Sequence, residues 1–258
     1  MLEVSLVKHT VRGSLYAAKV AAGEAERCAL QVEATLLGNL VHHPSILFPV
    51  ETCIGKSLSW IIFPLFPQPA SKAKPLCAET FDAYARQVLD GLRHLHKCSV
   101  IHADVKPSNT LWDPVRRHAV VCDLGLAVAY PFAYTEAKAP NLYYSAPYRA
   151  PELWAASKRS ETQVLLHFRT DVWALGCTLL EVSTGRCLFF SSTSVGVHMA
   201  IQDYVTARAG CSDLRCWSRK WEQRFASLRC LVWGRLILEF LQPVASKRPA
   251  LPELHPLI

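Results

Sequence analysis

Short apolar runs that are typical of strands fill the first seventy residues, around one longer helix-like segment. Residues 4–11 and 15–20 are rich in β-branched and small apolar residues and are separated by a turn signal at residues 12–14. Residues 46–54 and 57–63 form a second pair of such runs. Runs of this composition between turn formers predict strands, and we expect the second pair to be antiparallel. The beginning of the chain is therefore expected to form a small β-sheet.

Helical periodicity marks the segment between these strands and much of the chain beyond residue 75. Residues 23–40 carry Glu33 beside an apolar stripe, and the stripe consists of Ala29, Val32, Leu36, Leu37 and Leu40. Apolar positions three or four residues apart share one face of a helix. Periodicity, apolar character and boundary signals predict further helices over residues 79–97, from residue 150 onward, over 171–183 and over 231–241.

A proline-rich stretch separates the two kinds of pattern. Four prolines lie between residues 64 and 75, and the pattern changes there from strand-like to helical. Prolines at this density favour a linker. Residues 126–149 and 186–230 show no clear pattern and are expected to be irregular. We predict an α+β chain with a β-rich lobe at residues 1–66 and a mainly helical lobe at residues 67–258.

The composition is that of a folded chain with a substantial core. Of the 258 residues, 51% are apolar and only 19% are charged, which excludes a disordered chain. The longest apolar runs, residues 60–66 and 172–180, are too short to span a bilayer, so no membrane partner is expected. The net charge of +7 comes from dispersed Lys and Arg residues, which favour anions such as ATP over nucleic acid.

The cysteines indicate a reducing compartment. Ten of them are scattered along the chain without a C-x-x-C pair or a Cys/His cluster of zinc spacing. Most lie inside apolar segments, which is typical of buried free thiols. Glu3 and Lys8 interrupt the first apolar stretch, so no signal peptide is expected. These observations predict a cytoplasmic or nuclear protein.

Residues 102–109, His-Ala-Asp-Val-Lys-Pro-Ser-Asn, concentrate the candidate chemistry. Asp104 can accept a hydroxyl proton, Lys106 can neutralise a phosphate and Asn109 can bind a hard cation. This combination suits phosphoryl transfer, which depends on positioning and charge neutralisation. The alternative is a simple turn before a strand, because residues 107–109 are all turn formers. The motifs on either side distinguish these interpretations.

Further short motifs surround this octapeptide in a fixed order. They are Lys19, Glu33, Asp123-Leu124-Gly125, Tyr148-Arg149-Ala150-Pro151-Glu152, Asp171-Val172-Trp173-Ala174-Leu175-Gly176 and Arg248. The ordered set resembles the protein kinase family over nearly the whole chain, and the later motifs are most similar to cyclin-dependent and MAP kinases. The resemblance implies a two-lobed kinase fold, a Ser/Thr kinase activity on protein substrates, and ATP and Mg²⁺ as cofactors.

The resemblance also assigns roles near the reacting groups. It implies that Asp104 takes the substrate hydroxyl proton and that Lys106 contacts the γ-phosphate. Asn109 and Asp123 match the two residues that hold Mg²⁺, and both offer oxygen ligands.

The same resemblance assigns an ATP site between the lobes. Lys19 is implied to hold the α- and β-phosphates and to pair with Glu33, although these two are closer in sequence than is usual in the family. The residues implied to surround the adenine, as apolar walls, gatekeeper and hinge, are Ala17, Leu111, Phe63, Pro64 and Phe66. Pro64 lacks an N–H, but the implied hinge contact there needs only its carbonyl.

A last group of implied roles concerns the substrate platform. Glu152 and Arg248 match an ion pair that ties the activation segment, residues 123–152, to the helical lobe. Asp171 matches an aspartate that binds the backbone of the catalytic loop. Ser145 lies where the family has a threonine that contacts the catalytic aspartate.

Two features depart from the family pattern. The chain contains no G-x-G-x-x-G before Lys19, so we expect the first strand and the glycine-rich loop to be missing from residues 1–258. Ala103 stands in place of the arginine that pairs with a phosphorylated residue of the segment, and Pro140 lies near the usual phosphothreonine. We therefore predict an activity that does not depend on phosphorylation of the segment.

Two classes of function stay open from the sequence. The retained lysines, aspartates and Asn109 favour catalysis, whereas the missing loop and Ala103 favour a pseudokinase that serves as a nucleotide-binding or protein-binding scaffold. A small-molecule kinase is disfavoured by the Ala150-Pro151-Glu152 segment, which builds a peptide platform in the family. The sequence identifies no particular regulatory protein partner.

Overall fold

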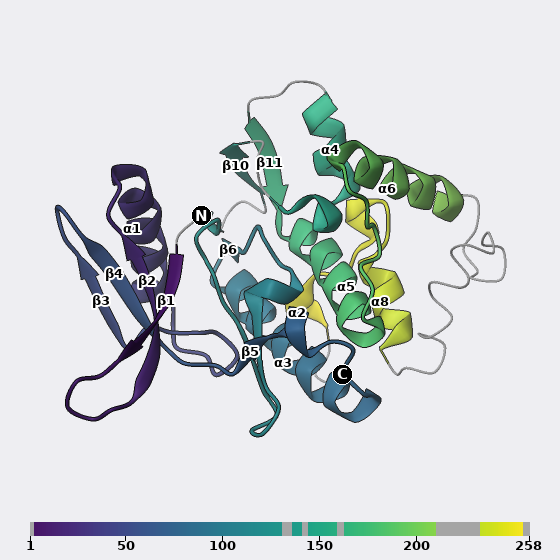
Figure 1. Ribbon diagram of the computed structural model, residues 1–258. Coiled ribbons are helices and arrows are strands. Elements are labelled where there is room, and N and C mark those ends of the chain that lie inside the picture. Colours follow the sequence, from purple (N-terminus) through teal and green to yellow (C-terminus); the bar gives the residue numbers. More distant parts are fainter. Residues whose placement is uncertain (1–2, 131–135, 141–143, 159–162, 210–232, 255–258) are drawn as a thin grey trace.

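A small sheet and one helix form the first part of the computed structural model, which describes residues 3–130, 136–140, 144–158, 163–209 and 233–254 (Figure 1). The sheet has the strand order β1-β2-β4-β3, with antiparallel neighbours throughout. Its elements are β1 (Glu3–Lys8), β2 (Leu15–Ala21), α1 (Glu24–Asn39), β3 (Glu51–Ile54) and β4 (Ser59–Pro64). The predicted strands are confirmed, but the third is shorter than residues 46–54.

Helix α1 packs on β2 and β4 with a face that matches the predicted stripe only in part: Leu37 is buried, and Leu36 and Leu40 pack against the core. Leu30, Glu33 and Leu37 are its buried residues, whereas Val32 is 52% exposed. The prediction was wrong there because it counted apolar residues only, and the buried face carries a glutamate that Lys19 neutralises. Val32, Leu36 and Leu40 instead line a cavity of about 710 Å³ next to residues 127–129.

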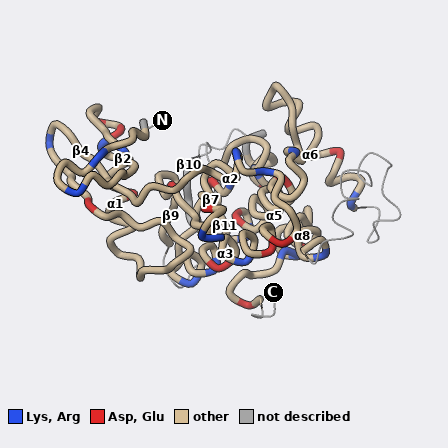
Figure 2. Tube along the Cα trace, turned by 60° about the horizontal axis from the view of Figure 1, so that its bottom comes forward, with Lys and Arg blue, Asp and Glu red and all other residues tan. Residues whose placement is uncertain are grey.

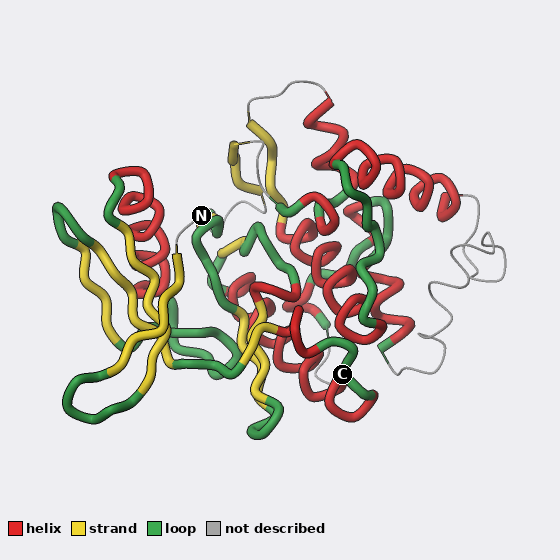
Figure 3. Tube along the Cα trace, viewed as in Figure 1, coloured by secondary structure: helices red, strands yellow, loops and turns green. Residues whose placement is uncertain are grey.

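The rest of the chain is mainly helical (Figure 3). Its helices are α2 (Ala70–Ala73), α3 (Ala78–Lys97), α4 (Pro151–Lys158), α5 (Phe168–Thr184), α6 (Ser194–Ala209) and α8 (Gly234–Phe240), with 3-10 turns η1 (Pro107–Asn109), η2 (Ala146–Tyr148), η5 (Ala245–Lys247) and η6 (Leu251–Glu253). Its short strands are β5 (Gln68–Pro69), β6 (Val100–Ile101), β7 (Thr110–Asp113), β8 (His118–Val121), β9 (Val128–Ala129), β10 (Glu136–Pro140) and β11 (Gln163–His167). The predicted α+β, two-lobed architecture is confirmed.

Helix α5 is the centre of the helical lobe. Its residues 170–182 are all buried, and the Trp173 ring stacks on Phe189 with centroids 5.7 Å apart. Gly176 is required by close packing, since a Cβ there would lie 2.9 Å from Leu241 Cγ. Gly185 ends the helix in the left-handed conformation, with φ of 75°. The predicted buried helix and its terminating glycine are confirmed.

Several elements lie in segments that were expected to be irregular. Helix α6 falls within residues 186–230, and β9, β10 and η2 fall within residues 126–149. Strand β10 pairs antiparallel with β11, from Glu136 opposite His167 to Pro140 opposite Gln163. Backbone pairing between distant segments leaves no periodic signal in either, which is why both strands were missed.

Two further observations bear on partners. No helix in the described ranges is both long and apolar enough to cross a membrane. Lys and Arg positions are spread over both lobes among Asp and Glu positions (Figure 2). The expectation that the chain binds no nucleic acid stays a prediction.

His167 begins α5 and makes the stability of the chain sensitive to acid. Its Nδ1 accepts a hydrogen bond from the Arg169 N–H at 3.0 Å. Burial, aided by the Arg169 charge, lowers the pKa of His167 from 6.5 to about 4. The unfolded chain therefore binds more protons between pH 6.5 and 4, and the free energy of unfolding falls as the pH falls through that window.

We expect His167→Asn to flatten this pH dependence, because asparagine keeps a capping acceptor but does not titrate. Thermal unfolding of both chains at pH 7, 5.5 and 4 measures the effect. The native chain should lose more of its Tm between pH 7 and 4 than the variant does. Parallel Tm profiles for the two chains would show that His167 does not carry the effect.

Candidate active site

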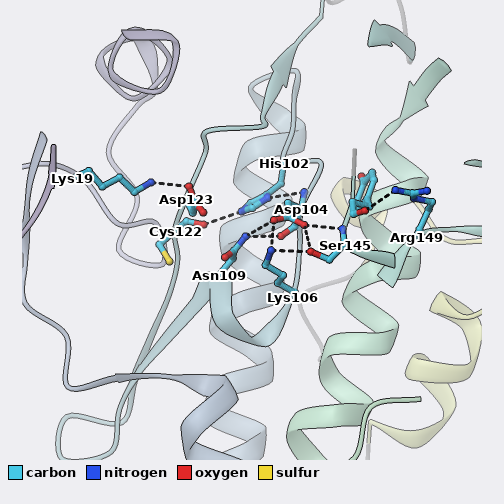
Figure 4. A network of polar contacts seen from close by, with 10 residues as sticks. Lys19, His102, Asp104, Lys106, Asn109, Cys122, Asp123, Ser145 and Arg149 are labelled. Atoms are coloured by element: carbon cyan, nitrogen blue, oxygen red, sulfur yellow. Dashed lines mark hydrogen bonds and ion pairs between the residues drawn. The ribbon is translucent and has the colours of Figure 1, made fainter. Parts of the chain in front are cut away.

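The octapeptide forms a loop between β6 and β7 in which every oxygen of Asp104 is held (Figure 4). Its Oδ2 accepts hydrogen bonds from Lys106 Nζ at 2.5 Å and from Asn109 Nδ2 at 3.0 Å. Its Oδ1 accepts from the N–H and the hydroxyl of Ser145, each at 3.1 Å. The structure thus brings together Asp104, Lys106, Asn109 and Ser145, four residues that the sequence singled out.

The backbone of this loop is fixed by Asp171 of α5. Asp171 Oδ2 accepts from the His102 N–H at 2.8 Å, and Oδ1 accepts from the Ala103 N–H at 3.0 Å. His96 Nε2 lies 2.9 Å from Oδ2. Burial alone would raise the pKa of Asp171, but the hydrogen bond and charge of His96, with smaller contributions from His102 and Tyr144, outweigh it and lower the pKa. Asp171 therefore stays charged and clamps the loop as the resemblance implied.

Lys19 joins α1 to the start of the activation segment. Its Nζ lies 2.7 and 2.8 Å from the two Glu33 oxygens and 2.7 Å from Asp123 Oδ1. Burial by itself would lower the pKa of Lys19, but the two carboxylates outweigh it and raise the pKa. The Leu124 N–H donates to Glu33 Oε1 at 3.1 Å. The Lys19–Glu33 contact forms despite their short separation in sequence.

Asp123 and Asn109 meet the requirements of a magnesium site. Asn109 uses its Nδ2 for two bonds to Asp104, so its Oδ1 is the atom that could bind a metal ion. Asp123 keeps 47% of its side chain exposed. The Cys122 backbone accepts from His102 Nε2 at 3.1 Å and donates to Asn109 O at 3.0 Å, so the two segments are joined. Two side chains that offer oxygen ligands suit Mg²⁺.

The part of the chain that the structure describes contains no group of three or more His, Cys, Asp or Glu side chains that could bind a metal ion.

The residues predicted to surround an adenine lie on both lobes. Ala17 on β2 is paired with Phe63 on β4, and Pro64 ends that strand. Phe66 follows, with its ring 5.7 Å from His118, and Leu111 lies on β7. Phe63 is buried, whereas Ala17, Leu111 and Phe66 are half-buried. Their contact with an adenine stays a prediction.

Glu152 and Arg248 form the predicted ion pair. Arg248 donates from Nη1 and Nη2 to the two Glu152 oxygens at 2.7 and 2.9 Å. The Arg248 side chain is fully buried and Glu152 is 32% exposed. Arg248 also donates to three backbone carbonyls, those of Arg169, Gln242 and Pro243. The pair joins the start of α4 to Arg248, the residue that follows η5.

Sequence reasoning missed two contributors to the site. Tyr144 is 3% exposed and donates from its hydroxyl to Asp171 Oδ1 at 2.7 Å. His96, at the end of α3, supports the same carboxylate. Neither belongs to a short motif, and the spacing of 27 residues between Tyr144 and Asp171 carries no signal of contact.

Three residues of the site hold a left-handed backbone without being glycine. They are Ala103, Asp123 and Tyr144, with φ of 62°, 65° and 68°. Each such residue costs about 1–3 kcal/mol unless its surroundings enforce it. Here the contacts to Asp171, Lys19 and Arg149 enforce it.

Comparison with known proteins gives a consistent result. The family model described as protein kinase domain matches residues 2–255. The putative cyclin-dependent kinase F-2 of Oryza sativa subsp. japonica is 33% identical over 65% of this chain and 46% of its own length. Mouse mitogen-activated protein kinase kinase kinase 5 is 28% identical over 86% of this chain and 16% of its own length. The chain spans less than half the length of these relatives.

A solved structure extends the likeness to the fold. The crystal structure of the yeast RNA Pol II CTD kinase CTDK-1 complex aligns with a TM-score of 0.78 at 22% identity. The alignment covers 97% of this chain and 86% of that chain. With the family match over residues 2–255, the chain belongs to the protein kinase domain family.

Proposed function

We propose that this chain transfers the γ-phosphoryl group of ATP to serine or threonine hydroxyls of proteins. The observation that carries the proposal is one connected set of contacts. It runs from Glu33 through Lys19 to Asp123, and through the Cys122 backbone to the loop that holds Asp104. Such a set supplies the phosphate charge, the metal ligands and the proton acceptor of phosphoryl transfer within one site.

Asp104 would accept the proton of the substrate hydroxyl. The hydroxyl oxygen forms a bond to the γ-phosphorus, the bond from that phosphorus to the β–γ bridging oxygen breaks, and ADP leaves. Lys106, whose Nζ also donates to Ser145 Oγ at 2.9 Å, offsets the charge on the transferred group. When bound, Mg²⁺ would neutralise phosphate charge, and Asn109 and Asp123 are the residues that would hold it.

The pseudokinase alternative is favoured by no contact in the described residues. Lys19, Asp104, Lys106, Asn109 and Asp123 are all retained and mutually oriented. A protein substrate follows from the family. A regulatory protein partner and a cytoplasmic or nuclear location stay predictions.

The geometry around Tyr144 supports a preference for proline after the phosphorylated residue. Arg149 Nη2 donates to the Tyr144 carbonyl at 3.1 Å, and Tyr144 immediately precedes Ser145, which contacts Asp104. That carbonyl is therefore occupied next to the point where the substrate hydroxyl would bind. A substrate N–H facing it would lose its hydrogen bond, whereas proline has no N–H to satisfy.

We expect a Ser-Pro peptide to be phosphorylated about 10-fold more efficiently than the matched Ser-Ala peptide, because one unsatisfied N–H costs about 1–3 kcal/mol. The measurement is kcat/KM of residues 1–258 with Mg²⁺-ATP and the two peptides. Arg149→Ala frees the Tyr144 carbonyl and should lower the ratio of kcat/KM between the Ser-Pro and Ser-Ala peptides. Equal rates on both peptides would refute the proline preference alone. ATP binding without transfer to either peptide would favour the scaffold alternative.

A further inference from the structure

Tyr144 belongs to the activation segment, and its side chain is buried. Its hydroxyl lies 2.7 Å from Asp171 Oδ1 and 2.7 Å from Thr170 Oγ1. A carboxylate cannot donate, so the phenol donates to Asp171. The side chain is 3% exposed although the backbone is left-handed, with φ of 68°. A buried tyrosine in a strained conformation indicates that its contacts are strong enough to enforce it.

The phenol completes the hydrogen bonding of the carboxylate that orients the catalytic loop. Asp171 Oδ1 receives Tyr144 and the Ala103 N–H, while Oδ2 receives the His102 N–H and His96. One carboxylate thus binds the loop before Asp104 and the segment before Ser145. The next residue on each side, Asp104 and Ser145, meet each other directly at 3.1 Å.

No arginine is available at position 103 to hold a phosphate on the segment. Ala103 is fully buried, and its N–H is used by Asp171. The segment is held by other means at residues 136–140 and at Tyr144. Upstream, β10 pairs with β11 through five residue pairs. Downstream, the Tyr144 phenol and carbonyl bind Asp171 and Arg149.

We propose that Tyr144 is a positioning residue that locks the substrate platform to the catalytic loop without phosphorylation. The expected effect on kcat rests on the proposed phosphoryl transfer, whereas the expected effect on the structure of the loop does not. The Tyr144 phenol takes over the anchoring that a phosphate and an arginine would provide. The platform then takes its position as soon as the chain folds, and the Tyr144 hydroxyl, which is buried against Asp171, does not contact substrate.

The experiment replaces Tyr144 by phenylalanine and compares it with Tyr204→Phe. Tyr204 is also a buried tyrosine, 1% exposed, whose hydroxyl donates to the Leu241 carbonyl at 2.9 Å away from the site. Both variants remove one buried phenol hydroxyl, so the control measures the general cost of such a removal. We expect Tyr144→Phe to lower kcat about 10-fold with the KM for ATP unchanged, and Tyr204→Phe to leave kcat near that of the native chain. A small misplacement of reacting groups is enough for such a loss.

A second readout is hydrogen exchange at the Ala103 and Ser145 amides. Both should lose protection in Tyr144→Phe and keep it in Tyr204→Phe, whether or not the chain transfers phosphate. If the native protein transfers no phosphate, the proposed function is refuted. Hydrogen exchange at these two amides would still test whether Tyr144 holds the activation segment to the catalytic loop. Equal protection and equal kcat in the two variants would overturn the inference. If Tyr144→Phe does not fold, phosphatase treatment of the native chain provides the test. We expect the treated chain to keep its kcat. A kcat that is lost on treatment and restored by a phosphate on the activation segment would overturn the inference.

Discussion

Asp104→Asn is expected to lower the rate of phosphoryl transfer about 10²–10⁴-fold, the contribution typical of a general base. The amide keeps the size of the side chain and can still accept from Ser145, which lies 3.1 Å from Oδ1. It cannot take the hydroxyl proton, and Lys106 loses the charge that it contacts at 2.5 Å. Binding of Mg²⁺-ATP should persist, because Lys19 and Asp123 are untouched.

The measurement pairs single-turnover transfer to a Ser-Pro peptide with a thermal shift in Mg²⁺-ATP. Asp90→Asn is the matched control, since Asp90 is an aspartate of α3 that is 49% exposed and pairs with Arg93. It should leave both readouts unchanged. If Asp104→Asn transfers phosphate at the native rate, another group accepts the proton and the assignment of Asp104 is wrong.

Glu152→Gln is expected to give the largest loss of stability among single substitutions at the site. It leaves Arg248, whose side chain is fully buried, without its carboxylate partner. Breaking a buried pair from one side costs about 3–5 kcal/mol. Glu152 is 32% exposed and Arg248 keeps three carbonyl acceptors, so we expect the lower figure. A loss of about 3 kcal/mol lowers Tm by about 6–12 °C in a chain of this size.

Thermal unfolding at pH 7 measures this loss, and Glu239→Gln provides the control. Glu239 forms an exposed pair with Arg235 at 3.6 Å, and such pairs contribute about 0–1 kcal/mol. Its variant should unfold within a few degrees of the native chain. A Tm for Glu152→Gln that matches the control would mean that the carbonyl contacts alone satisfy Arg248.

The site was predictable from sequence where its residues belong to short motifs with strict spacing. Asp104, Lys106 and Asn109 lie within six residues, and loop geometry alone brings them together. The Lys19–Glu33 contact followed from the family pattern and not from periodicity, which placed the buried face of α1 on apolar residues. A buried glutamate is invisible to an argument that equates burial with apolar character.

The rest of the site depends on contacts between distant segments. The pairing of β10 with β11 and the Tyr144–Asp171 bond join residues about 27 positions apart. Neither segment has a pattern of its own, because the partner supplies the hydrogen bonds. Helix α6 was missed for a related reason: its buried residues, Val197, Ile201 and Tyr204, are few and lie among exposed apolar ones such as Val195 and Met199. Only the tertiary structure distinguishes these two kinds of apolar residue.

The three residues with a left-handed backbone favour the geometry of the site at the expense of stability. Ala103, Asp123 and Tyr144 each sit in a conformation that glycine would adopt without strain. Glycine at Ala103 would relieve the strain, and it would also free the loop before Asp104 to sample other directions. Selection for thermal stability alone would therefore favour substitutions that loosen the geometry of the site. Substitutions that raise the heat resistance of this chain should therefore be sought on the surface of α3 or α6, and these three residues should be kept.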